Sequence, residues 1–557
     1  MPVPLPAGST VAMLRAFLTI AMIVQCAAIP LRADNLLPAD QSMESVIDHY
    51  VDAKIKTDDV QVAAQIEANI LIRRLTLDLA GRIPTTAEVH AFQAANAETR
   101  RVELVDRLLA SPDFNDHHRN ELQLLLEYPD RRNDNDFRKY LLWAVEQNRP
   151  WSEMFRDMLA GDENDEYQKA SLQFVKHRAR NLDDLTNDTA VLFFGVNVSC
   201  AKCHDHPLVA DWKQDHYYGM QSFFTRTFLT KKQGLGEKFY GEVKFTTTAG
   251  VEKQAKFMFL NGAVVEDRTP ELTDESRKQY DQLVKKLEQD DKAEATYPDF
   301  RPRQQLVETA SHKDNDDFLA RNIVNRIWHR LIGRGIVDPP DQLHSENAPS
   351  HPELLNWLAE DTIAHGYDLK RLIRGIVLST TYSRSSEWTS AAEPPSGEYF
   401  SVAISRPMSP RQYAMSLLVA TRNPPHWEQW LSKPTEDWKK ERTGLENSAN
   451  GWASQFEIPG DNFQVAVDEA LFFSNNDRIT NDLLRDSGDR LVGHLKQIEN
   501  SSDAVTAAFE AIGSRTPTDD ELAAIQTYLE SRTEDRTAAI KQVVWALLTG
   551  PELRFNY

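Results

Sequence analysis

The spacing of apolar residues constrains the fold most, because it repeats every three or four positions along much of the chain. Residues 318–332 carry four apolar pairs at this spacing: Phe318-Leu319, Ile323-Val324, Ile327-Trp328 and Leu331-Ile332. Such pairs fall on one face of an α-helix, and Gly333 directly after them is typical of a helix end. Residues 34–230 and 301–557 read largely in this way, so we predict a mainly α-helical protein with two helical domains.

The stretch between these regions has a different pattern. Within residues 239–265 apolar and polar side chains alternate, and Ala249-Gly250 can form a turn. Residues 281–296 are highly charged. Alternation over short runs is typical of half-buried strands. We therefore predict a small β-hairpin insert and a charged linker at residues 231–300.

Two segments far apart in the chain share one pattern. Residues 82–89 read Arg-Ile-Pro-Thr-Thr-Ala-Glu-Val, and residues 515–522 read Arg-Thr-Pro-Thr-Asp-Asp-Glu-Leu. Thr85 and Glu88 fit a capping box, in which each residue bonds the backbone amide of the other. We predict a second such box at Ser350 and Glu353. This repeated pattern predicts that one type of helical hairpin occurs at both ends of the molecule, in a structural role.

Composition excludes several partners. The 557 residues are 41% hydrophobic, which is enough for a sizeable core without metal or disulfide staples. The formal net charge of −21 argues against a nucleic-acid surface and against attraction to anionic lipid. A basic protein partner is compatible with this charge, although acidity also simply keeps a protein soluble.

The first 33 residues are typical of a secretory signal peptide. Arg15 precedes the apolar run 16–24, and Ala33 suits the last position before a cleavage site. The run is short for a membrane span. We predict an exported protein of the periplasm or cell envelope, with no integral membrane span in the mature chain. The alternative is an uncleaved N-terminal anchor.

The cysteines carry the strongest chemical signal. Of three cysteines, Cys26 lies in the predicted signal, and the other two belong to the motif Cys200-Ala201-Lys202-Cys203-His204. A Cys-x-x-Cys-His run is the attachment pattern of c-type haem, in which both thiols form thioethers and the histidine binds the iron. We predict one covalent haem c on Cys200 and Cys203, with His204 as the proximal ligand.

The second axial ligand is harder to read. Met220 and His216 are near the motif in sequence, and His117 and His118 are candidates from elsewhere, whereas His206 is too close to His204 to reach the opposite face of the same haem. Aromatic and apolar residues flank the motif and suit either a haem wall or the protein core: Leu192, Phe193, Phe194, Trp212, Tyr217, Tyr218, Phe223 and Phe224.

Three other uses of the motif remain open. Cys200, Cys203, His204 and His206 are residue types that bind zinc, although closed zinc sites usually draw ligands from two segments. The two thiols suit a redox disulfide, or the motif has a structural role only. We find no phosphate-binding loop, HExxH motif or nucleophile elbow, so no catalytic residue is assigned and an electron-transfer or binding protein is favoured over an enzyme.

Several of these motifs resemble the planctomycete cytochrome-like family. The residues that carry this likeness are 74–85, 104–112, 198–207 and 211–219. The C-terminal half is similar to the planctomycete-specific domain that commonly follows it, at residues 325–328, 333–339, 349–355, 367–370 and 546–557. Residues 467–472 depart from that pattern, with Asp468 and Glu469 where a glutamine is expected before Ala470-Leu471.

The resemblance implies architecture and export more than activity, because the role of this family is largely unassigned. Our leading hypothesis is an exported monohaem protein that passes electrons to an unidentified redox protein or senses redox state. The alternatives are a non-haem exported interaction or scaffold module with a structural metal, and an accessory to extracellular polysaccharide degradation.

Overall fold

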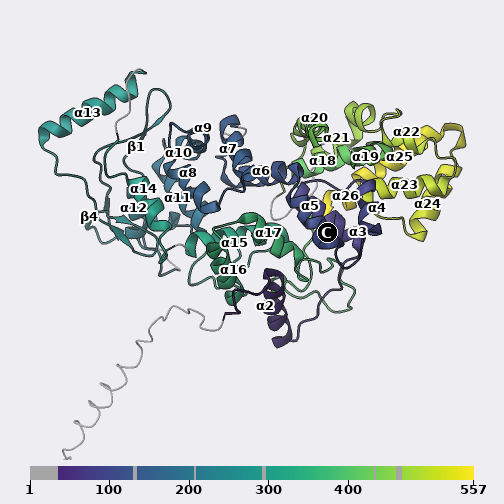
Figure 1. Cartoon of the computed structure of the whole chain (residues 1–557), viewed down its shortest axis with the longest axis horizontal. Helices are drawn as coiled ribbons and strands as arrows, with labels where there is room; N and C mark the ends of the chain where they lie inside the picture. The colour runs from purple at the N-terminus through teal and green to yellow at the C-terminus, as the bar shows by residue number, and fades with distance from the viewer. Residues whose placement is uncertain are drawn as a thin grey trace, which may run out of the picture. The chain divides into compact units, whose positions relative to one another are not determined.

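Helices dominate the computed structural model, as the apolar spacing predicts, and the only strands described form short two-stranded pairs (Figure 1). The structure describes residues 36–128, 134–205, 209–291, 297–315, 317–431, 435–459 and 467–557. The predicted signal peptide, His206 and part of the charged linker lie outside these ranges. Residues 39–557 form one unit by their contacts. The predicted domain limits at residues 230 and 300 stay predictions.

The N-terminal part is a succession of short helices. They are α2 (Met43–Thr57), α3 (Ala68–Ala80), α4 (Thr86–Ala94), α5 (Arg100–Leu109), α6 (Pro112–Leu126), α7 (Asn135–Glu146), α8 (Trp151–Ala160), α9 (Glu166–Ser171), α10 (Gln173–Arg178), α11 (Leu182–Phe194), the 3₁₀ turn η2 (Ser199–Lys202) and α12 (Gln214–Ser222). The capping box of Thr85 and Glu88 opens α4 as predicted.

Three antiparallel hairpins follow and confirm the predicted β insert. They pair β1 (Thr227–Leu229) with β2 (Leu235–Glu237), β3 (Lys244–Thr246) with β4 (Glu252–Gln254), and β5 (Phe257–Met258) with β6 (Val264–Val265). The first hairpin begins before residue 239, where the alternation becomes visible in the sequence. Helix α13 (Asp274–Gln289) comes next, and Leu287 is its one fully buried residue, as its high charge implies.

Helices return after the insert. They are α14 (Pro302–Ala310), α15 (Asp317–Ile332), α16 (Pro352–Ala364), α17 (Leu369–Leu378), η3 (Gly397–Tyr399), α18 (Pro410–Ala420), α19 (Pro424–Leu431), α20 (Thr435–Ala453), α21 (Val467–Asn475), η4 (Ile479–Leu483), α22 (Leu491–Leu495), α23 (Ser501–Gly513), α24 (Asp519–Glu530), η5 (Thr533–Asp535), α25 (Arg536–Thr549) and α26 (Pro551–Arg554). The predicted box at Ser350 is wrong, because α16 begins one residue later, with His351 as its N-cap and no side-chain cap.

The two helical regions pack against each other. Helix α15 contacts α11, and α17 contacts α2 and α5. Asp78 of α3 is buried and accepts hydrogen bonds from Tyr382, Arg406 and Asn556, at 2.7, 2.8 and 2.9 Å. Arg406 and Asn556 lie on β7 (Arg406–Pro407) and β8 (Phe555–Asn556), which pair with each other. A buried carboxylate held in this way ties the first helices to the last strand.

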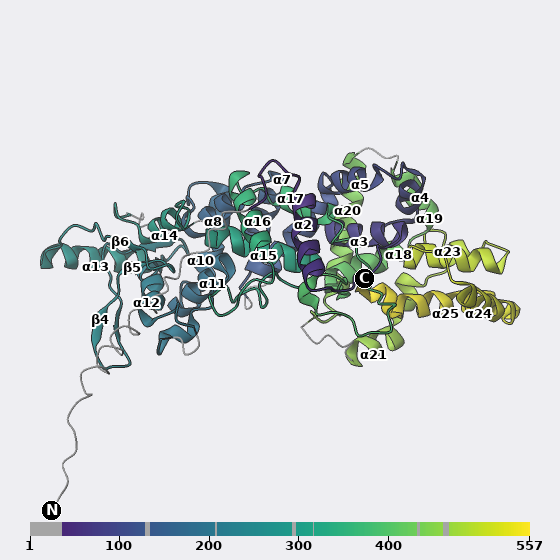
Figure 2. The same ribbon diagram turned by 90° about the horizontal axis from the view of Figure 1, so that it is seen from below.

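At one end of the unit, α23, α24 and α25 lie side by side (Figure 2). Their buried residues share one apolar cluster with Leu77, Ile83 and Ala87 from the start of the chain. Of the helices that the structure describes, none is long and apolar enough to cross a membrane.

Candidate haem-attachment site

The motif follows a helix end that another region of the chain holds in place. Helix α11 ends at Gly195, which has φ = 68°. A Cβ there would lie 2.8 Å from the side-chain oxygen of Asn322, so the position favours glycine. The Gly195 carbonyl accepts a hydrogen bond from Leu343 N at 2.9 Å, and Val196 bridges to Gln342. The segment leading to the cysteines is therefore fixed against the loop before α16.

The cysteines and the histidine then lie on and just after the short turn η2. Cys200, Cys203 and His204 are exposed, and both thiols are free. Ala201 between them is fully buried. The turn thus packs through its small residue and presents its reactive atoms to solvent, as covalent attachment of a haem requires.

Side chains of helix α12 hold the turn by donating hydrogen bonds to the backbone carbonyls of the turn. The Tyr218 hydroxyl donates to the carbonyl of Lys202 at 3.0 Å. The Gln214 side-chain amide donates to the carbonyls of Lys202 and Cys203, at 3.4 and 3.3 Å. Gln214 N also donates to Asp205 at 3.0 Å. The chain on both sides of His204 is therefore bonded to the first residues of α12.

A second anchor comes from α11. The Asp183 carboxylate accepts hydrogen bonds from Lys202 Nζ at 2.5 Å, from the Tyr217 hydroxyl at 2.6 Å and from the Gln221 amide at 2.9 Å. The hydrogen bond from Lys202, followed by that from Tyr217, lowers the pKa of Asp183 below its ordinary value. Lys202 lies between the two cysteines, directly before Cys203, so this carboxylate acts directly on the motif.

The imidazole of His204 makes one hydrogen bond, to the backbone of the next residue. Its Nδ1 lies 2.8 Å from the carbonyl oxygen of Asp205, to which the protonated nitrogen donates. A proton held on Nδ1 leaves Nε2 unprotonated and able to bind a metal. This hydrogen bond is compatible with the proximal role of His204, which stays a prediction.

The candidates for a distal ligand lie in different surroundings. Met220 is fully buried, and His216 is half-buried with its Nδ1 accepting from Lys213 N at 3.1 Å. Burial lowers the pKa of His216. His117 and His118 are buried in another network, beside Gly81 and Arg330. The one hydrogen bond described for the His204 ring goes to the Asp205 carbonyl, so the distal ligand stays a prediction.

The aromatic flanks belong to the core. Five of these side chains are completely buried: Phe193, Phe194, Tyr217, Phe223 and Phe224. Phe193 packs with Phe155 and Phe174, and Phe194 packs with Phe259. Their density near the cysteines therefore reflects packing of α11 and α12.

Metal binding by clustered side chains has no support in the parts of the chain that are described. There, no three His, Cys, Asp or Glu side chains are grouped so that they could hold a metal ion. His206, one of the four residues proposed as zinc ligands, lies outside those parts.

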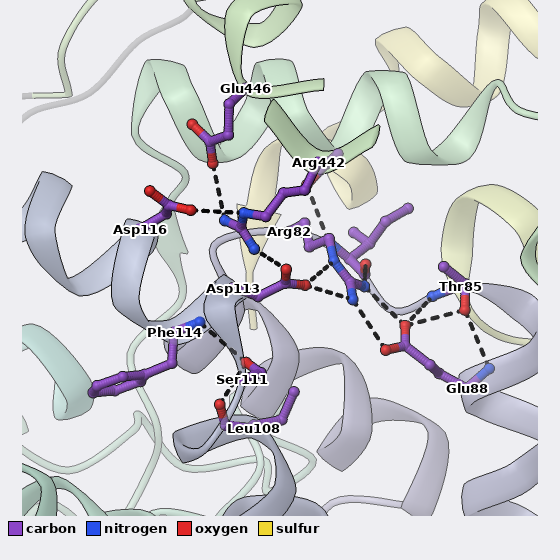
Figure 3. Close-up of polar contacts among 12 residues, drawn as sticks. Arg82, Thr85, Glu88, Leu108, Ser111, Asp113, Phe114, Asp116, Arg442 and Glu446 are labelled. Carbon is purple, nitrogen blue, oxygen red and sulfur yellow. Dashed lines mark hydrogen bonds and ion pairs between the residues drawn. The ribbon is translucent and has the colours of Figure 1, made fainter. Parts of the chain in front are cut away.

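A second dense polar cluster occurs where the sequence pattern repeats (Figure 3). Arg82 donates to both oxygens of Glu88, at 2.8 and 3.0 Å, and to Asp113 at 2.9 Å. Glu88 closes the capping box with Thr85. We call Arg82, Glu88 and Asp113 the first clasp. Arg442 of α20 adds a second cation on Asp113.

The second copy has the same bonds. Arg515 donates to both oxygens of Glu521 at 2.8 Å, and to Glu552 at 2.6 and 2.9 Å. We call Arg515, Glu521 and Glu552 the second clasp. The preceding helices also end alike, since Gly81 and Ser514 both have positive φ, at 69° and 60°. The predicted repeat is thus a repeated structural unit, in which Arg515 makes hydrogen bonds to the same kinds of partner as Arg82.

In both clasps the donors and acceptors are occupied by one another, which makes them structural units. Sequence reasoning missed two side chains that matter, Asp183 and Arg442. Asp183 contacts Lys202, and Arg442 contacts Asp113, across distant parts of the sequence, so no local pattern could have revealed these two contacts.

Comparison with known families agrees with the motif-based resemblance. Residues 46–228 match a family model described as PSCyt2, a protein of unknown function (DUF1549). Residues 302–450 match a second model, PSD1, described as a protein of unknown function (DUF1553). Their order is that of the planctomycete cytochrome-like domain and the C-terminal domain that follows it. No curated protein and no solved structure matches the chain.

Proposed function

We propose that this chain, in which a PSCyt2 domain precedes a PSD1 domain, is an exported c-type cytochrome with one covalently bound haem. The observation that carries the proposal is the turn at residues 199–204, which bears the motif and which we call the attachment turn. Cys200, Cys203 and His204 are exposed together, and the Asp205 carbonyl leaves Nε2 of His204 available. The name of the first family model points the same way.

The residues have distinct roles in this proposal. The thiols of Cys200 and Cys203 form the two thioether bonds, and His204 binds the iron through Nε2. The Asp205 carbonyl orients the imidazole, and Tyr218 and Gln214 hold the turn. When bound, haem supplies a reversible one-electron couple. The exposed turn gives a redox partner access to this site, for electron transfer or redox sensing.

The proposed location and partner follow from the chemistry. Haem is attached to such motifs outside the cytoplasm, which agrees with the signal peptide predicted at residues 1–33. We propose the periplasm or cell envelope as its location. Since the chain has a net charge of −21, a redox partner with a basic docking surface would associate fastest with it.

The proposal is tested by producing the full chain in a host with c-type haem maturation. We expect a sharp reduced α-band in the visible spectrum of the folded protein. We also expect the haem to stay attached to the protein under denaturing conditions. His204→Ala should retain the covalent haem and change the axial-ligand bands. An unmodified protein with free thiols, with bound zinc or with a Cys200–Cys203 disulfide would overturn the proposal and favour the corresponding alternative.

A further inference from the structure

We infer that Asp183 is a positioning residue for haem attachment, because its carboxylate fixes Lys202 and with it the direction of the thiols on either side. This inference rests on the proposed function of the motif. Asp183 itself touches neither thiol; it acts through Lys202 and α12.

The two oxygens of the carboxylate have separate partners. Oδ2 accepts from Lys202 Nζ at 2.5 Å, whereas Oδ1 accepts from Tyr217 and Gln221 of α12, at 2.6 and 2.9 Å. One side chain therefore joins the centre of the Cys-x-x-Cys turn to the helix that supports it. Lys202 is held at both ends, because its carbonyl accepts from Tyr218 at 3.0 Å.

The start of α11 favours a carboxylate at this position. Asp183 lies in the first turn of the helix, and Asn181 caps that turn by accepting from the amide of Asp183 at 3.1 Å. Unpaired amides at a helix start stabilise a negative charge. Asp183 is therefore set by its own helix before it engages the turn.

A fixed turn matters for the chemistry because two thioether bonds must form on one haem. Each bond consumes one thiol and one vinyl group, the thiol proton passing to vinyl carbon, and no electrons are gained or lost overall. A turn that samples several conformations leaves the second thiol misaligned after the first bond has formed. Loss of the Asp183 anchor should therefore favour protein with a single thioether link.

The first experiment uses the haem-free full chain and is independent of the proposed function. Asp183→Asn keeps the Oδ1 acceptor for Tyr217 and Gln221, and replaces the oxygen that faces Lys202 with an amide group. We expect amide hydrogen exchange in residues 199–205 to rise by about two- to fivefold in Asp183→Asn, and equally in Lys202→Met, because the paired side chains are 37% and 44% exposed. Tyr217→Phe is the matched control, because it removes one bond to the same carboxylate and leaves Lys202 anchored.

The second experiment uses the same variants in the maturation host. The fraction of protein with one thioether rather than two, read from the pyridine haemochrome spectrum, should increase in Asp183→Asn and Lys202→Met and stay low in Tyr217→Phe. Wild-type exchange in the haem-free variants, together with wild-type linkage in the haem-containing ones, would overturn the role of Asp183. A wild-type protein without haem would overturn the proposed function, while the exchange data would still test the anchor.

Discussion

The attachment turn and the first clasp are both rich in polar side chains, but they use them in opposite ways. In the first clasp, Arg82, Glu88 and Asp113 are between 5% and 11% exposed and bind one another. In the turn, the thiols and the imidazole are exposed, and the bonds go to the backbone and to Lys202. Atoms that are paired and buried hold a fold together, whereas atoms that are oriented and left accessible can do chemistry.

The two clasps offer a second, finer contrast. Their bonds are the same, but the side chains of the second clasp are between 20% and 35% exposed. The first clasp is covered by α20, which adds Arg442. Water screens charges at the more open position, so the same set of bonds should contribute less there.

Removal of Arg82 should have the largest effect on stability. Arg82→Ala leaves the buried Glu88 carboxylate without its bidentate partner, and we expect a loss of about 3–5 kcal/mol in the free energy of unfolding. Urea denaturation followed by circular dichroism measures this loss. A change below about 1 kcal/mol would show that the clasp is not a structural centre.

Lowering the pH should have the second-largest effect on stability, because it weakens the first clasp. Burial alone would raise the pKa of Glu88, but the charge and hydrogen bonds of Arg82 outweigh it and lower the pKa to about 2. Because the folded pKa is depressed, this contribution is complete above about pH 4.5 and is lost as the pH falls toward 2. We expect the free energy of unfolding to fall by up to about 3 kcal/mol over this pH range. In Glu88→Gln this part of the pH dependence should vanish; an unchanged profile would contradict the assignment.

Removal of Arg515 should cost less than removal of Arg82. We expect Arg515→Ala to lose about 1–2 kcal/mol, because its carboxylate partners are partly hydrated. Measured beside Arg82→Ala in urea, the pair gives a matched comparison of the same contacts at two degrees of burial. Equal losses would mean that burial does not set the difference between the clasps.

Removal of both cysteines should have the smallest effect on the haem-free fold. Cys200 and Cys203 are exposed, so their double replacement by alanine should change the unfolding free energy by less than about 0.5 kcal/mol. Thermal unfolding of the two haem-free proteins checks this. A large loss of stability would mean that the thiols serve packing, and would favour a structural role for the motif.

Local patterns predicted much of this structure and little of the site's surroundings. Apolar spacing and the Thr85 cap predicted the helices, and the Arg-Pro-Thr-Glu echo predicted a repeat that the clasps show in full. The Ser350 cap was wrong because the same pattern fits a residue one position before the true N-cap, which is His351. Phe193 and Phe194 were ambiguous because an aromatic run suits a core as well as a haem wall.

What the sequence could not reveal depends on contacts between distant segments. Asp183 reaches Lys202 only because α11 and α12 pack together, and Arg442 reaches Asp113 only because α20 lies over α6. The distal ligand stays a prediction: Met220 is fully buried on α12, and His216 on the same helix is half-buried.

The intact mass of the denatured protein from a maturation-competent host tests the account most directly. We predict that the wild-type chain carries the added mass of one haem, and that the Cys200→Ala, Cys203→Ala double variant carries none while remaining folded. A wild-type mass without haem would contradict the central claim that the exposed turn is a haem-attachment site.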